Sequence, residues 1–222
     1  MRTRNIVIFV TVIVIIVLAG AVYSCFYGTP WGRATAREEI SQYLKDKYSK
    51  DMTISSVYYN VKRGGYDAQV YSNEDEIVFI VEPGLNVSGY KYRDCYLSSM
   101  WQKQIADEIK KNVKIEDNTE IYVSMMRHFT IFEEKIQIPY YGDVPDKIQF
   151  PRIYLYNDVD KKVDYGQLLE IISFIKTKKI KYDRIFYKYY KNDKNKKGIE
   201  FTWEDAKKIN SLEDIERFID SE

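Results

Sequence analysis

The histidine content limits the catalytic chemistry that this chain could perform. His128 is the only histidine in 222 residues, and a Ser-His-Asp or Cys-His mechanism needs a histidine held beside its nucleophile by a third group. Ser124 is the nearest serine in sequence, but the glycines of a nucleophile elbow do not surround it. We therefore predict that the protein is not an enzyme, and we assign no catalytic residue.

Metal and cofactor sites are not indicated either. One histidine and two separated cysteines, Cys25 and Cys95, do not make up a usual zinc ligand set. Residues 157–164 resemble a calcium loop, but lysines stand at ligand positions and the glycine at position six is missing. The sequence also contains no Walker lysine loop and no dinucleotide-binding glycine pattern. We expect no metal and no cofactor.

Residues 176–198 are the most prominent charge feature. They hold nine lysines and Arg184 against two aspartates, with five aromatic residues between them. A basic and aromatic surface is suited to an anionic partner such as a lipid headgroup, a wall polymer or an acidic protein. Residues 199–222 carry eight acids against three bases. The alternative, that the two stretches neutralise each other within the fold, therefore stays open.

The N-terminus contains an apolar stretch of membrane-spanning length. No charged residue lies between Arg4 and Arg33, and about 20 apolar residues in a helix cross the ~30 Å hydrocarbon core of a bilayer. The basic residues that precede the stretch favour a cytoplasmic N-terminus and an extracytoplasmic body in the cell membrane. Aromatic residues at its far end fit the headgroup interface: Tyr23, Phe26, Tyr27 and Trp31.

Two other interpretations of the N-terminus are a cleaved signal peptide and a lipoprotein signal. A cleaved signal peptide has an apolar core of about 7–15 residues, which is shorter than this stretch, although cleavage after Ala21 stays open. Lipidation of Cys25 requires small residues directly before it, and Tyr23 is bulky. We expect one uncleaved membrane-spanning helix.

The remaining chain is close to electrically neutral. Residues 33–222 hold 32 of the 34 basic residues against 33 acidic ones, so no overall field favours nucleic acid. The body contains one cysteine, Cys95, and must therefore be stabilised by packing and not by an internal disulfide. Its 190 residues are enough for one large domain or two small ones with cores of their own.

The hydrophobic pattern predicts an α+β fold, in which an N-terminal transmembrane helix is followed by antiparallel sheets each covered by helices. We expect three parts: residues 1–32 as anchor, 33–138 as a helix plus antiparallel meander, and 151–222 as a second small α+β domain. The expected helices cover about 33–48, 94–112 and 164–179, followed by two short C-terminal helices. The expected strands lie near 57–61, 66–70, 77–81, 121–125, 129–132, 152–156, 185–190 and 199–201.

Several of these segments resemble one family. The membrane helix ends in Gly28-Thr-Pro-Trp-Gly32, and the next helix carries Ala36, Tyr43-Leu44 and Tyr48. Tyr66-Asp-Ala-Gln-Val70 and the stretch from Asp94-Cys-Tyr96 to Trp101 follow. Together these residues are similar to the YfjL-like family of Gram-positive membrane-anchored or lipoprotein-type proteins, most clearly over residues 26–110. The resemblance implies an outer-surface location and supplies no site residues.

These observations favour a non-enzymatic function. We expect a single-pass membrane protein whose extracytoplasmic body is a binding or regulatory module for a protein, a peptide or a cell-wall component. The partners would be the membrane and an envelope protein or an anionic wall polymer, and not nucleic acid. The alternative is an envelope enzyme that uses carboxylates or tyrosines as acid-base groups in a cleft between the two halves.

Overall fold

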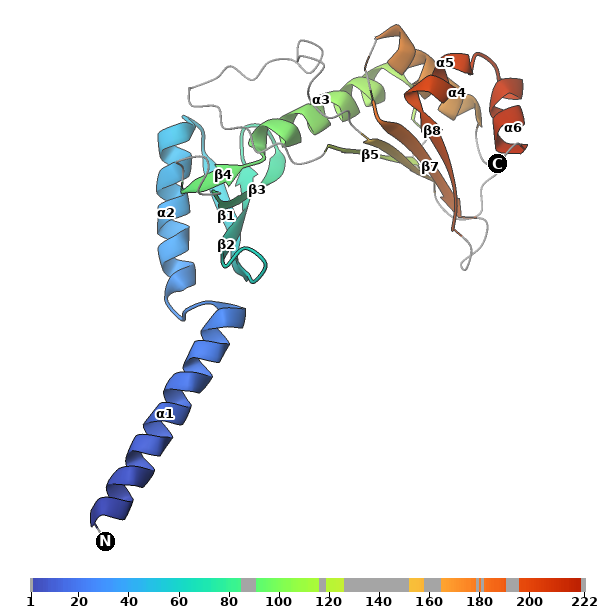
Figure 1. The fold of residues 1–222 in the computed structure, drawn as a ribbon. Helices are drawn as coiled ribbons and strands as arrows, with labels where there is room; N and C mark the ends of the chain where they lie inside the picture. Colours follow the sequence, from blue (N-terminus) through green and yellow to red (C-terminus); the bar gives the residue numbers. More distant parts are fainter. Residues whose placement is uncertain are drawn as a thin grey trace. The chain divides into compact units, whose positions relative to one another are not determined.

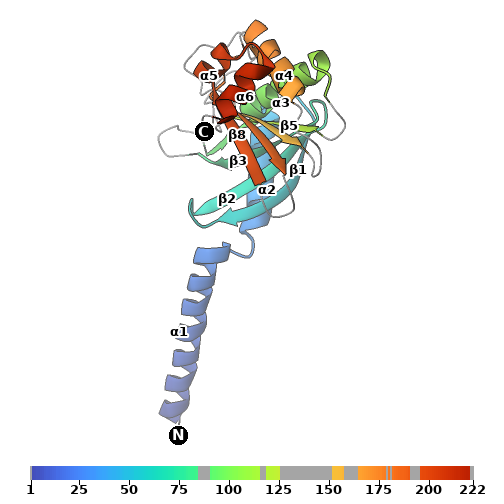
Figure 2. The ribbon, with the colours of Figure 1, turned by 90° about the vertical axis from the view of Figure 1, so that its right-hand side faces the viewer.

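The computed structural model describes residues 2–84, 91–115, 119–125, 152–157, 165–178, 180, 182–190 and 196–220. These residues form six helices and two four-stranded sheets, ordered β1-β2-β3-β4 and β5-β6-β7-β8 (Figures 1 and 2). The predicted α+β class, with a long apolar N-terminal helix, is confirmed. The helices are α1 (Arg2–Tyr27), α2 (Gly32–Lys47), α3 (Tyr96–Asn112), α4 (Tyr165–Thr177), α5 (Trp203–Lys208) and α6 (Leu212–Asp220). The strands are β1 (Met52–Asn60), β2 (Gly65–Ser72), β3 (Ile77–Pro83), β4 (Tyr92–Asp94), β5 (Thr119–Ser124), β6 (Arg152–Asn157), β7 (Arg184–Tyr190) and β8 (Lys196–Thr202).

The described residues divide into two compact units. The first contains the chain up to Tyr96, and the second contains the chain from Leu97 onward. The boundary expected between residues 138 and 151 and the strand expected at 129–132 lie outside the described residues.

Helix α1 is long and apolar enough to cross a membrane by its length and composition. Its large apolar side chains are exposed from Ile6 to Tyr27. A water-soluble protein would normally bury such a continuous stripe, so this surface is suited to lipid.

The first unit packs α2 against a four-stranded antiparallel sheet. Ala36, Ile40 and Leu44 recur every four residues and are buried, which places them on one face of the helix. The hairpin between β1 and β2 turns at residues 61–64, where Gly64 adopts a φ of 62°. Strand β3 lies inside the sheet, as its apolar residues predict. Strand β4 was not predicted, because its three residues are too few to show a periodicity.

The second unit has one sheet with a fully apolar face. Two neighbouring rows of side chains across the four strands are buried, and they share one core with side chains from α3, α4, α5 and α6. The rows are Ile121–Leu155–Tyr187–Ile199 and Val123–Ile153–Ile185–Phe201.

One strand pair of the second sheet differs from the antiparallel prediction. Strands β6 and β7 are parallel, whereas β5–β6 and β7–β8 are antiparallel. Helix α4 lies between β6 and β7 in sequence, and a helical crossover is the usual way to return a chain for parallel pairing.

Candidate functional site

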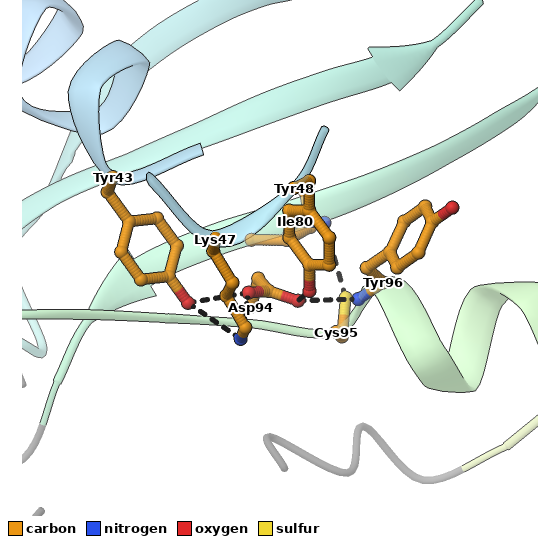
Figure 3. A network of polar contacts seen from close by, with 7 residues as sticks. All are labelled: Tyr43, Lys47, Tyr48, Ile80, Asp94, Cys95 and Tyr96. Atoms are coloured by element: carbon orange, nitrogen blue, oxygen red, sulfur yellow. Dashed lines mark hydrogen bonds and ion pairs between the residues drawn. The ribbon is translucent and has the colours of Figure 1, made fainter. Parts of the chain in front are cut away.

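A buried aspartate organises the polar contacts at the end of α2. Asp94 ends β4 and is only 2% exposed. Its carboxylate accepts hydrogen bonds from the hydroxyls of Tyr43 (2.6 Å) and Tyr48 (2.8 Å), and Lys47 Nζ lies 2.7 Å away (Figure 3). The backbone N–H of Tyr96 also donates to it (3.0 Å), so the same carboxylate caps the first turn of α3.

This Asp94 network has the properties of a structural network. Burial raises the pKa of Tyr48, and the charge of Asp94 raises it further. A phenol whose pKa is raised stays protonated and acts as a hydrogen-bond donor. Both carboxylate oxygens of Asp94 already have donors, so the network is closed within the chain.

A second, partly buried acid, Asp75, is held in a similar way. Lys50 Nζ lies 2.7 Å from Asp75, and the hydroxyls of Tyr96 and Ser72 donate to the same carboxylate. Burial acts to lower the pKa of Lys50, but its hydrogen bonds to Asp75 and Tyr96 outweigh that effect and raise the pKa to about 12. Burial, followed by the bond to Asp75, raises the pKa of Tyr96 to about 12 as well. This cluster is also occupied by its own residues.

Cys95 lies in sequence between Asp94 of the first cluster and Tyr96 of the second. Its thiol is not part of a disulfide and is buried, and its sulfur accepts the backbone N–H of Ile80 at 3.2 Å (Figure 3). A buried thiol of this kind behaves as a small core residue.

Two buried carboxylates lie on adjacent strands, β2 and β3. Asp67 is 1% exposed and Glu82 is 0% exposed. Arg63 Nη1 lies 2.7 Å from Asp67 and 2.5 Å from Glu82, and Arg93 forms a second ion pair with Glu82. Asn60 also donates to Asp67 (2.7 Å). Two guanidinium groups therefore balance two carboxylates, which is the pattern of a structural ion-pair cluster.

An open groove lies next to the turn that joins α1 to α2. Its volume is about 360 Å³. We call it the elbow groove, and it is bounded by the turn, by α2, and by residues of β2, β3 and β4. It is lined by Thr29, Trp31, Gly32, Thr35, Ala36, Glu39, Gly65, Tyr66, Pro83, Lys91 and Tyr92.

The elbow groove carries charge at one place. The ammonium of Lys91 and the hydroxyl of Tyr92 both donate to the Glu39 carboxylate. These two bonds, with Lys91 the stronger influence, lower the pKa of Glu39. The other walls are aromatic or small, and Trp31 is 69% exposed at the rim. The groove thus combines an ionised acid with apolar walls.

The second sheet presents a different surface on the face opposite its core. Tyr122, Tyr154 and Phe186 are directly opposite one another on β5, β6 and β7. The rings of Tyr154 and Phe186 stack at 4.8 Å, and Tyr122 lies 6.0 Å from Tyr154. Tyr122 is 52% exposed, and the other two are partly exposed. We call this row the aromatic row.

Charged residues border the aromatic row. Arg152 and Arg184 form the next row of the same face, and Glu200 on β8 continues the aromatic row itself. Arg152 Nε lies 2.9 Å from Asp183, and Arg184 pairs with Glu200. An aromatic centre with a charged rim is typical of protein-binding surfaces.

Within the described part of the chain, the candidate residues named from the sequence do not form a catalytic site. Ser124 lies at the end of β5, paired with Arg152 of β6. His128 and residues 158–164 lie outside the described residues. In the basic stretch, Lys176 donates to the carbonyl of Ile209 (2.8 Å), and Arg184 pairs with Glu200 as described above. The pair of Arg184 and Glu200 joins the basic stretch to the acidic one, whereas Lys176 contacts a neutral carbonyl.

Sequence reasoning missed the Asp94 network. The spacing of Tyr43 and Tyr48 with Ile40 and Leu44 predicts only an apolar helix face, and it gives no partner for the two hydroxyls. The signal available was a tyrosine pair on a buried helix face, because a buried hydroxyl requires a hydrogen-bond partner.

Residues 3–84 match the family model described as YfjL-like, N-terminal domain. The matched region contains α1, α2 and strands β1 to β3, and it includes most residues of the elbow groove. It supports the resemblance inferred from the sequence for the N-terminal part of the chain. No curated protein and no solved structure matches this chain.

Proposed function

We propose that this protein is a single-pass membrane protein whose extracytoplasmic body binds a protein, a peptide or a cell-wall component. The observation that carries the proposal is the aromatic row on the second sheet. Aromatic side chains supply a large apolar contact area with few rotatable bonds, and they are enriched at binding hot spots. All three rings lie outside the buried core and keep part of their surface exposed.

The residues at the start of α1 support an extracytoplasmic body. Arg2 and Arg4 precede the apolar segment, and α1 contains no acidic residue. Basic flanks are retained on the cytoplasmic side of membranes. The chain that follows Tyr27 would then lie outside the cell.

The three buried carboxylates of the first unit support a structural role over acid-base chemistry at these positions. A general acid or base must be able to reach a substrate and exchange a proton with it. Asp94, Asp67 and Glu82 are each at most 2% exposed, and each is held by tyrosine, lysine or arginine side chains of the same unit. Buried, paired groups of this kind stabilise the fold, and we assign binding to the aromatic row.

The aromatic row can be tested with full-length protein in detergent, used as bait for envelope extract. Replacing Tyr122 by Ala should weaken capture of the partner by about 2 kcal/mol, or roughly 30-fold in Kd, if this residue is a hot spot. Tyr58→Ala is the matched control, because Tyr58 is 40% exposed on β1 of the other unit. Equal capture by both variants would disprove the role of the aromatic row.

A further inference from the structure

The elbow groove begins directly after the membrane-spanning helix. Helix α1 ends at Tyr27, and Thr29 and Trp31 already line the groove. The polar headgroup layers add roughly 5–8 Å on each side of the ~30 Å hydrocarbon core. Tyr23 and Tyr27 stack with 4.8 Å between ring centroids, as an aromatic pair at the headgroup level would. In a membrane that α1 spans, the elbow therefore lies in or next to the headgroup layer.

The walls of the groove are suited to a cation. Glu39 is an ionised acid, and the rings of Trp31, Tyr66 and Tyr92 line the same space. Aromatic rings and a carboxylate together form a favourable environment for ammonium groups, because both present negative potential.

The structure contains an ammonium group at this place. Lys91 Nζ pairs with Glu39 and lies 6.0 Å from the centroid of the Tyr92 ring. The Lys91 side chain is 68% exposed, so it can leave the pair at little cost in packing. Lys91 thus marks the position at which an external ammonium group would bind.

We propose that the elbow groove binds the ammonium-bearing headgroup of a phospholipid from the membrane that α1 spans, with Glu39 as the acceptor in place of Lys91. The apolar walls next to Glu39 would contact the glycerol and upper acyl region. We favour a lipid over a soluble ammonium compound because the groove lies so close to the end of α1. This site is separate from the aromatic row, so it does not depend on the proposed binding of an envelope partner.

The test uses the full chain in an uncharged detergent, titrated with short-chain phosphatidylethanolamine. Trp31 is the reporter, since it is exposed at the rim whereas Trp101 is buried. We expect a saturable change in tryptophan emission that is absent in Trp31→Phe. Short-chain phosphatidylglycerol, which lacks an ammonium group, should give at most a weak change. An equal response to both lipids would overturn the proposal.

Two neighbouring acids on α2 provide a matched pair of variants. Glu39→Gln should weaken phosphatidylethanolamine binding by roughly five-fold, as expected for a partly exposed charge pair. Glu38 is exposed and does not line the groove, so Glu38→Gln should leave binding unchanged. Equal effects of the two substitutions would mean a general surface charge and would overturn the site.

Lys91→Gln should change phosphatidylethanolamine binding in the opposite direction to Glu39→Gln. Because it removes the competing ammonium group, it should strengthen phosphatidylethanolamine binding, and weaker binding would contradict the proposed displacement. Glycerophosphoethanolamine, which has the headgroup but no acyl chains, distinguishes a lipid ligand from a soluble ammonium compound. Binding of this compound as tight as that of the lipid would overturn a lipid ligand in favour of a soluble one.

Discussion

Tyrosine hydroxyls and lysines hold the acids of the first unit in a repeated arrangement. Each of three carboxylates accepts from at least one phenol and pairs with one lysine. Such bonds are stronger than those between neutral groups, since the acceptor is charged. This accounts for part of the high tyrosine content, 21 residues. The groups are Asp94 with Tyr43, Tyr48 and Lys47; Asp75 with Tyr96 and Lys50; and Glu39 with Tyr92 and Lys91.

The Asp94 network should make a large contribution to stability. Replacing Asp94 by Ala leaves two tyrosine hydroxyls and Lys47 without their acceptor, and we expect a loss of about 3 kcal/mol in the free energy of unfolding. The measurement is urea denaturation of the full chain in detergent, followed by circular dichroism. Asp46→Ala is the control, because Asp46 is exposed on α2, the helix that carries Tyr43 and Lys47. This substitution should cost less than about 0.5 kcal/mol. Similar losses in the two variants would contradict this role.

The Asp75 cluster predicts instability at alkaline pH. Lys50 and Tyr96 both have folded pKa values of about 12, above their unfolded values of about 10. Their contribution is therefore complete below pH of about 10 and is lost as the pH rises towards about 12. Denaturation across this range should show less pH dependence in a Lys50→Met, Tyr96→Phe double variant than in the wild type. An unchanged pH dependence would exclude this cluster as its source.

Tyr66 fixes the turn between α1 and α2. Its hydroxyl donates to the carbonyl of Thr29 (3.1 Å), and its ring packs against Gly28 and Gly32, where there is no room for a side chain. Gly28 also adopts a φ of 75°, which favours glycine. The Gly-Thr-Pro-Trp-Gly sequence thus ends α1 and also leaves space for the ring of Tyr66 from β2.

An alanine at position 32 should disturb this contact. Its Cβ would lie 2.0 Å from the hydroxyl oxygen and 2.4 Å from the Cζ ring carbon of Tyr66, so the ring must move. We expect a loss of about 2 kcal/mol for Gly32→Ala, measured by urea denaturation. Gly20→Ala is the control, since nothing lies within 4 Å of that position. In a Tyr66→Ser background the cost of Gly32→Ala should largely disappear; an unchanged cost would mean that the ring is not its cause.

Elements with a strong local pattern were predictable from the sequence. The four-residue spacing of Ala36, Ile40 and Leu44 located α2, and the alternation before Gly64 located the first hairpin. The parallel pairing of β6 with β7 was not predictable, because alternation within a strand does not identify its neighbour. The same limit applies to the elbow groove. Its residues come from positions 29 to 92, and only the fold brings them together.

At the scale of the whole molecule, the two proposed binding surfaces belong to different parts of the chain. The elbow groove is built mainly from the region that matches the YfjL-like family model, and the aromatic row lies beyond residue 84. The first would contact the membrane through an ammonium headgroup, and the second would contact an envelope partner. The second proposal requires that the body lies outside the cytoplasmic membrane, whereas the first requires only that α1 spans a membrane.

This orientation can be measured with a membrane-impermeant maleimide on intact cells. Cys95 is buried, so a Cys25→Ser background should label weakly. Leu212 is 46% exposed at the start of α6, and Leu212→Cys in that background should label strongly if the body is outside. Thr3→Cys precedes the apolar segment and should label only after the cells are permeabilised, because basic flanks keep the N-terminus in the cytoplasm. The reverse pattern, with position 3 labelled and position 212 protected, would place the body inside and contradict the proposed envelope partner.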